Sequence, residues 1–195
     1  MLGLTVPEAI LIGSAVGLGA FAVRSNRADV TYVKASDGRE YLVQNFADRA
    51  QAAETLARLR TTLVALLDYA AGDKTLAEDD RIIRLRDNWN RETLSEGSNR
   101  SKYTSFTTDK RDITMCLRSA TTNQLEPFDL LTFVLLHEAA HCATEVAVDA
   151  HNPDFWQNFK FILQVAVDAR LYVKQNFKDR PVKFCGVDVT DSPLK

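Results

Sequence analysis

Apolar positions recur along the chain with two periods, every second residue and every third or fourth, which predict short strands and helices respectively. Alternating residues flank the turn signal Asp37-Gly38 and predict a β-hairpin over residues 29–45. A leucine stripe with helical spacing predicts a helix over residues 47–71, which Gly72 ends. A further helix is predicted over residues 73–89.

The middle of the chain begins with a polar segment and continues with segments in which apolar and polar residues alternate. Residues 91–102 are rich in Ser, Asn and Glu, which predicts a mobile loop that forms a lid or rim over a site. The alternation in residues 103–107 and 113–118 predicts two paired strands. Near the C-terminus, the short apolar stretch of residues 182–189 is expected to form a strand or an extended arm.

Two long helices are predicted between these strands and the tail. The first covers residues 127–144, and its nearly continuous apolar run is typical of a buried helix. The second covers residues 152–176, begins at Asn152-Pro153 and has a buried stripe that extends to Val173. Together the elements predict an α+β fold, in which a short antiparallel sheet packs on a central helix with further helices around it.

The N-terminal segment differs from the rest because residues 9–23 contain no charge. A helix over residues 5–23 would be about 28 Å long, close to the roughly 30 Å of bilayer hydrocarbon. Ala9, Gly13 and Gly17 recur every fourth residue, a pattern through which membrane helices associate with one another. The segment is therefore predicted to cross a membrane and to self-associate.

The charges around this segment favour one topology. No basic residue precedes the apolar run, so a signal peptide is not favoured, whereas a buried soluble helix remains an alternative. Arg24 and Arg27 follow the run directly. By the positive-inside tendency, residues 1–27 form the anchor and residues 28–195 form a domain that faces the cytosol.

Composition and charge narrow the possible partners. The 195 residues carry a net charge of -2, which gives no general attraction to nucleic acid. The arginines of residues 81–102 are interspersed with acids and are expected on a solvated face. Three cysteines without a C-x-x-C pair predict reduced thiols rather than a disulfide framework, and Cys142 is expected in the core.

The 3 histidines all lie within one short window, and two of them belong to the motif His137-Glu138-Ala139-Ala140-His141. Residues four apart on a helix share a face, so His137 and His141 can reach one metal ion. This motif is typical of zinc peptidases, in which the glutamate takes a proton from metal-bound water. The sequence therefore predicts a Zn²⁺ site with Glu138 as the catalytic base.

A catalytic zinc usually has three protein ligands and one open position. His151, just before the last predicted helix, is the expected third ligand. Glu145 competes for this place, but eight residues of straight helix separate it from His137 by roughly 12 Å, too far for one ion. Glu145 is better interpreted as an outer partner or a surface acid, and Asp149 and Asp154 are weaker alternatives.

These residues carry a resemblance to a known family. The motif of residues 137–141, followed by His151-Asn152-Pro153-Asp154-Phe155-Trp156, resembles the compact zinc metallopeptidases of the SprT/WLM type over roughly residues 103–176. The resemblance implies a small zincin-like domain with three histidine ligands. The apolar leader and the tail also resemble small metallopeptidase-like proteins encoded by large DNA viruses, which implies a place in a virion.

Two functions are consistent with these features. The first is a membrane-tethered zinc endopeptidase, whose protein or peptide substrate adds to the edge of a strand before the metal helix. Tyr103, Arg170 and Tyr172 are candidates for its oxyanion donor. The second is a catalytically silent zinc protein, a scaffold or virion component, in which a side chain fills the fourth metal position. Hydrolysis of a non-peptide substrate is a more distant third.

Overall fold

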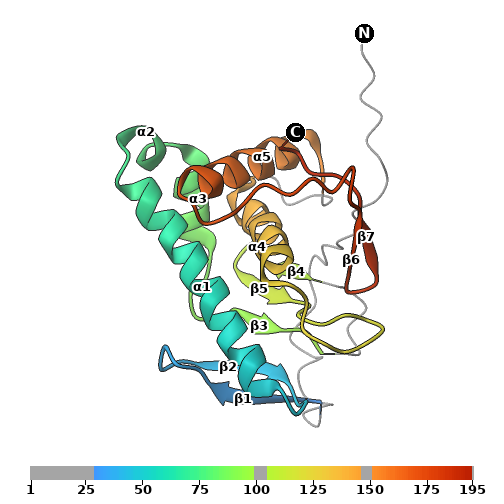
Figure 1. Cartoon of the computed structure of the whole chain (residues 1–195). Coiled ribbons are helices and arrows are strands. Elements are labelled where there is room, and N and C mark those ends of the chain that lie inside the picture. Colours follow the sequence, from blue (N-terminus) through green and yellow to red (C-terminus); the bar gives the residue numbers. More distant parts are fainter. Residues whose placement is uncertain (1–28, 99–104, 146–150, 195) are drawn as a thin grey trace.

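Helix α4 (Phe128–Ala143) lies in the middle of the molecule, and three helices and two strands of the central sheet pack against it (Figure 1). The computed structural model describes residues 29–98, 105–145 and 151–194. Its elements are β1 (Val30–Lys34), β2 (Glu40–Gln44), α1 (Arg49–Ala71), α2 (Lys74–Ala77), α3 (Asp80–Asn88), β3 (Ser95–Glu96), β4 (Phe106–Thr108), β5 (Asp112–Met115), α4 (Phe128–Ala143), α5 (Pro153–Asp168), β6 (Val182–Phe184) and β7 (Val187–Val189). The mixed α+β class with small sheets is as predicted.

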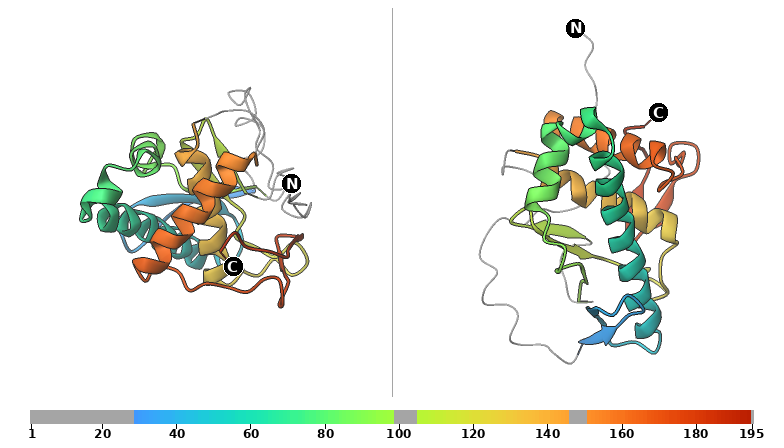
Figure 2. Two further views of the ribbon diagram at one scale, coloured as in Figure 1. Left: turned by 90° about the horizontal axis from the view of Figure 1, so that it is seen from above. Right: turned by 90° about the vertical axis from the view of Figure 1, so that its left-hand side faces the viewer.

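The N-terminal hairpin and the long helix after it follow the local sequence signals. Strands β1 and β2 pair antiparallel, with Val33 opposite Tyr41. Gly38 adopts a φ of 83° in the connecting turn, a conformation that glycine reaches without a steric penalty. The hairpin lies at the end of α1 that is remote from α2, as the right-hand view of Figure 2 shows.

The central sheet has the strand order β3-β5-β4, so β4 lies at its edge and next to α4. β4 and β5 form the predicted antiparallel pair. Asp109 and Lys110 connect them with positive φ angles, which match the right-handed twist of the strands. The loop predicted over residues 91–102 is wrong in part, because Ser95–Glu96 forms β3 and pairs parallel with β5.

A buried ion network explains why that polar segment enters the sheet. The Arg118 side chain is 4% exposed and donates hydrogen bonds to Glu96 and to Asp48, each at 2.8 Å. The Glu96 carboxylate also accepts the main-chain N–H of Gln44 at 2.7 Å. A buried charge is costly unless it is paired, so these contacts fix β3 against β2 and the start of α1.

Two helix predictions are corrected. The helix expected over residues 73–89 is divided into α2 and α3, because the Asp79 side chain accepts the Arg81 N–H and caps a new helix. The last helix ends at Asp168, not near residue 176. Arg170, with a φ of 58°, forms a Schellman-type cap there, and Val173 is 73% exposed instead of buried.

The expectation of reduced cysteines is also wrong. Cys116 and Cys185 form a disulfide across 69 residues of sequence, whereas Cys142 is a free, buried thiol as predicted. The bond joins the chain after β5 to the turn between β6 and β7. It therefore holds the C-terminal hairpin, which forms within the predicted apolar stretch, against the central sheet.

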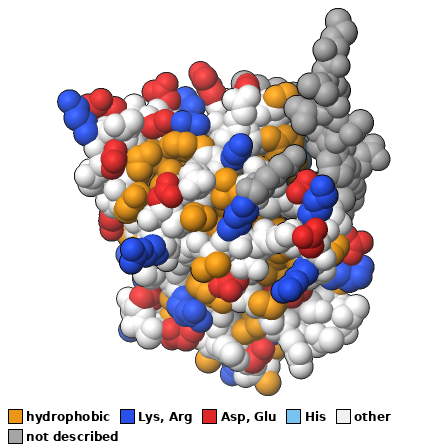
Figure 3. Space-filling model, turned by 45° about the horizontal axis from the view of Figure 1, so that its top comes forward, with side chains coloured by type: hydrophobic (Ala, Val, Ile, Leu, Met, Phe, Trp, Pro, Cys, Tyr) orange, Lys and Arg blue, Asp and Glu red, His pale blue; other side chains and the backbone are white. Residues whose placement is uncertain are grey.

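The predicted N-terminal anchor lies outside the described residues. Within the described ranges, no helix has the length and apolar character needed to cross a bilayer. On the face shown in Figure 3, Lys and Arg side chains are intermixed with Asp and Glu. Of the arginines predicted on a solvated face, Arg86 is exposed and pairs with Asp87, whereas Arg84 is partly buried and donates to the Ala143 carbonyl.

Candidate metal centre

Helix α4 carries the metal motif through the core. Its apolar run has no polar face, and 13 of its 16 residues are buried, so it packs against neighbours on all sides. The helix begins after Pro127, and Asp129 in its first turn complements the positive end of the helix dipole. This burial places His137 and Glu138, both 0% exposed, inside the molecule.

The structure brings the three predicted histidines together. His137 and His141 lie on one face of α4, and their ring centroids are 5.1 Å apart. His151 directly precedes α5, where Asn152 caps the helix by accepting the Phe155 N–H at 2.8 Å. One ring nitrogen from each histidine lies within 4.8 Å of the others, so the three residues form a group that can hold a metal ion.

The spacing of the nitrogens matches a small coordination sphere. The Nε2 atoms of His137 and His151 are 3.1 Å apart. Two imidazole nitrogens bound to one tetrahedral zinc at about 2.05 Å would be roughly 3.3 Å apart. His137 and His151 therefore already have the spacing of two zinc ligands, and the His141 nitrogen lies within 4.8 Å of both.

The electrostatics of the group favour neutral imidazoles, the form that binds metals. Burial lowers the pKa of His141 to about 3 and that of His151 to about 4, and it also lowers the pKa of His137 well below its ordinary value. Nearby histidines add to the effect for His137 and His141. The lowered pKa values favour uncharged rings at neutral pH, and each uncharged ring has one nitrogen lone pair that a metal ion can bind.

Aromatic side chains from α5 fix the orientation of the rings. Phe155 stacks on His141 with ring centroids 4.4 Å apart, and Phe159 meets His137 edge-on at 5.1 Å. The partly buried Trp156 ring lies 5.6 Å from that of His151. These contacts exclude water from one side of the group and place an aromatic surface beside it.

Glu138 has one satisfied and one unsatisfied carboxylate oxygen. Its Oε2 accepts a hydrogen bond of 2.8 Å from the Thr107 hydroxyl of β4. Its Oε1 is buried and has no protein hydrogen-bond partner among the described residues. Burial raises the pKa of this carboxyl to about 8, although the Thr107 bond opposes the shift. A carboxyl with this pKa is mostly protonated at neutral pH in the metal-free protein, and a nearby cation would favour its ionised form.

The C-terminal end of α4 is held by side chains that sequence reasoning did not identify. Asn88 Nδ2 donates to the Cys142 carbonyl at 2.9 Å, and Arg84 Nε donates to the Ala143 carbonyl at 2.8 Å. Lys110 Nζ donates to the carbonyls of Thr144, at 2.7 Å, and Glu145. Donors from α3 and the β4–β5 turn thus satisfy the carbonyls that follow His141, where positive charge also favours the helix dipole.

The rival ligands that lie in the described ranges, Glu145 and Asp154, do not join the histidines. Glu145 and Asp154 are exposed, and Asp149 lies outside the described residues. Of the proposed oxyanion donors, Tyr103 is also outside them and Arg170 is exposed. Tyr172 is buried, but its ring packs on Phe133, a full turn of α4 before His137. The described part of the chain therefore assigns none of these residues to the metal centre.

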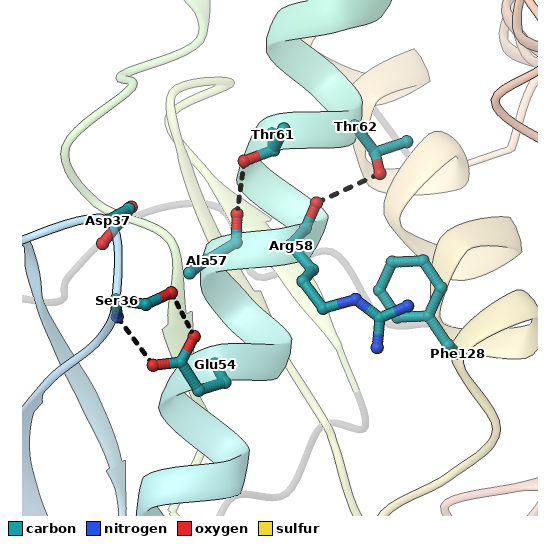
Figure 4. Close-up of a pocket in the computed structure, with 8 residues that line it drawn as sticks. All are labelled: Ser36, Asp37, Glu54, Ala57, Arg58, Thr61, Thr62 and Phe128. Carbon is teal, nitrogen blue, oxygen red and sulfur yellow. Dashed lines mark hydrogen bonds between the residues drawn. The ribbon is translucent and has the colours of Figure 1, made fainter.

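A separate hollow of about 300 Å³ lies beside α1 (Figure 4). It is lined by Ser36, Asp37, Glu54, Ala57, Arg58, Thr61, Thr62 and Phe128. Ser36 donates to both oxygens of Glu54, and the Arg58 guanidinium lies over the Phe128 ring. The lining residues thus bind largely to one another, and the hollow contains none of the histidines.

Comparison with known proteins gives one similar sequence over nearly the whole chain. The chain is 31% identical over 189 residues to "Uncharacterized protein R325" of Acanthamoeba polyphaga mimivirus, and the match covers 95% of each protein. No protein-family model matches the chain, and no solved structure matches it.

Proposed function

The chain belongs to the family of the mimivirus protein R325, and from that premise and the residues of the metal centre we propose that it is a zinc-dependent metallopeptidase similar to the SprT/WLM type. One observation carries the proposal: three imidazole nitrogens lie within 4.8 Å of one another, and the residue that follows the first of these histidines on the helix is a fully buried glutamate. Histidines that do not share a ligand are not expected to converge in threes in an aromatic pocket.

The donor set fits zinc better than other common metals. Three neutral imidazoles are the ligand set of many catalytic zinc sites, whereas Mg²⁺ and Ca²⁺ prefer carboxylate and carbonyl oxygens. Among the described residues, the group contains no thiolate and no carboxylate ligand. When bound, Zn²⁺ supplies Lewis acidity that lowers the pKa of water and polarises a carbonyl group.

Glu138 performs the proton transfer in this proposal. Its unpartnered Oε1 accepts the proton of the attacking water, and Oε2 stays bonded to Thr107. A zinc ion held by the histidines would favour the ionised carboxylate that accepts this proton. Burial, which raises the pKa of the carboxyl, would then help the group to hold the proton and to donate it to the leaving amine. A carboxyl with its ordinary pKa would release the proton to solvent more readily.

The position of β4 supports a peptide substrate. β4 is the edge strand of the central sheet and supplies Thr107, the residue that contacts Glu138. An extended peptide that adds to this edge would lie along the metal centre and bind through main-chain hydrogen bonds. The half-buried Trp156 provides an aromatic surface for one of its side chains.

The test combines metal analysis with peptide cleavage. Purified protein is expected to contain about one zinc per chain and to cleave a peptide library in a chelator-sensitive reaction. Glu138→Gln is expected to keep the zinc and lose hydrolysis, whereas His151→Ala is expected to lose most of the zinc. Full cleavage by Glu138→Gln, or zinc retention by His151→Ala, would contradict the assigned roles. Zinc binding without any cleavage would favour the silent structural protein.

A further inference from the structure

Thr107 is the middle residue of β4, and its side chain points from the sheet toward α4. It pairs with Ile113 of β5, so the strand that carries it is fixed by the antiparallel ladder. Its side chain is buried, with 8% of the residue exposed. A hydroxyl in such a place needs a hydrogen-bond partner, and its partner is 31 residues away in sequence.

The hydroxyl of Thr107 faces two oxygens of the same residue. Oγ1 lies 2.8 Å from Glu138 Oε2 and 3.2 Å from the Glu138 main-chain carbonyl oxygen. A hydroxyl has one proton to donate, and the ionised carboxylate, which is the form that acts as a base, is a stronger acceptor than a main-chain carbonyl. The carboxylate therefore receives this proton, at the shorter of the two distances.

The contact distinguishes the two oxygens of the carboxylate. Among the described residues no cation pairs with Glu138, and Oε1 has no protein partner. Without the hydroxyl, a buried carboxylate could rotate, and either oxygen could turn toward the histidines or away from them. With it, Oε2 is fixed to the sheet and Oε1 remains to accept a proton.

We propose that Thr107 is a positioning residue that orients Glu138 by bonding Oε2, so that Oε1 is the oxygen that receives the proton from water. This inference rests on the proposed peptidase function. It adds that the sheet, and not only the metal helix, sets the geometry of the base. Misplacement of a reacting group by about 1 Å can slow a reaction by about 100-fold, so one hydroxyl has a measurable effect.

The matched variants are Thr107→Val, which has nearly the same shape without a hydroxyl, and Thr107→Ser, which keeps it. Thr132→Val is the control, because Thr132 is also buried, lies on α4 and donates only to the Phe128 carbonyl of its own helix. Thr107→Val is expected to lower kcat by roughly 10- to 100-fold with KM and zinc content unchanged. Thr107→Ser and Thr132→Val are expected to stay within about threefold of wild type, as neither removes the contact.

A second readout is independent of activity. In metal-free protein, unfolding is compared for wild type, Thr107→Val, Glu138→Leu and the double variant. The effect of the double change on the unfolding equilibrium constant is expected to differ by about fivefold or more from the product of the two single effects. The reason is that the two residues share one buried hydrogen bond. Multiplicative effects would show that the hydroxyl and the carboxylate are not coupled, and would overturn the inference.

The outcomes separate this inference from the proposed function. If wild type and Thr107→Val cleave peptide equally well, Thr107 does not position the base, while the peptidase assignment stands. If Thr107→Val and Thr132→Val lose activity equally, the loss reflects general packing and the inference also fails. A wild-type protein that binds zinc and cleaves no peptide overturns both.

Discussion

At the scale of single residues, the centre depends on imidazoles that stay uncharged. Burial acts against the charged form of all three histidines, and phenylalanine rings cover His137 and His141. The same burial that keeps the rings uncharged for a metal also lowers the free energy of unfolding at low pH, because each ring must remain unprotonated in the folded state.

The pH dependence of the metal-free protein follows from this. Between the ordinary pKa of 6.5 and the folded values of about 3 for His141 and about 4 for His151, the unfolded chain binds protons that the folded chain does not. The free energy of unfolding is therefore expected to fall as the pH drops from about 6.5 toward 4. Urea unfolding in chelator at several pH values measures this, and His151→Gln is expected to show a shallower pH dependence. An unchanged slope would contradict the assigned burial of His151.

The sequence identified the histidines because their signal is local. Two ligands are four residues apart on one helix, and the third lies at a helix start marked by Asn152-Pro153. Thr107 and Lys110 have no such signal, because they reach α4 or its end from 31 to 35 residues away. A lone threonine or lysine in an alternating strand region is common, and only the folded sheet gives these two a role.

At the scale of elements, α4 depends on its neighbours at its C-terminal end. α3 and the β4–β5 turn supply the donors to the last carbonyls, and this end of the helix carries His141. Asp109 and Lys110 adopt left-handed conformations in this turn, and the Lys110 side chain reaches the carbonyls at the end of the helix. The β4–β5 hairpin therefore holds the C-terminal end of the metal helix in place.

Removal of the lysine tests this unit. Lys110→Met keeps much of the side-chain length and removes the ammonium group that bonds the Thr144 and Glu145 carbonyls. Zinc affinity is expected to fall by roughly 10-fold or more, because the helix end that carries His141 is less firmly held. Competition with a chromophoric chelator measures the affinity. Lys183→Met is the control, since Lys183 forms an exposed pair with Asp188, and an equal loss in both variants would contradict the role of Lys110.

Local signals also explain which elements were predicted correctly. The first hairpin, α1 and α4 each have a turn residue, a periodic stripe or an apolar run within their own sequence. β3 does not, because two residues pair with a strand 19 positions away and are held by Arg118. The end of α5 was misplaced because its cap uses Arg170 in a position where glycine is the usual signal.

At the scale of the whole molecule, the disulfide closes a ring that contains α4, α5 and all three histidines. Inside the ring, Phe177 packs on Phe133 at 4.8 Å, so the C-terminal segment supports the metal helix directly. Disulfides persist mainly in oxidising surroundings, which is the opposite of the reduced state expected for a cytosol-facing domain. Three cysteines without a paired spacing do not predict this bond, because nothing in the local sequence indicates which two of them lie close together.

Loss of the disulfide is expected to lower stability by a predictable amount. The bond joins residues 69 positions apart, and restricting the unfolded chain by such a loop contributes about 4 kcal/mol to the free energy of unfolding. Cys116→Ala/Cys185→Ala should show this loss in urea unfolding of metal-free protein, and a reducing agent should lower wild type to the same value. The double variant serves as the control because reductant should not change it further. If fully reduced wild type, verified by mass spectrometry, unfolds at the same urea concentration as the oxidised protein, the C-terminal hairpin is held by its packing and not by the bond.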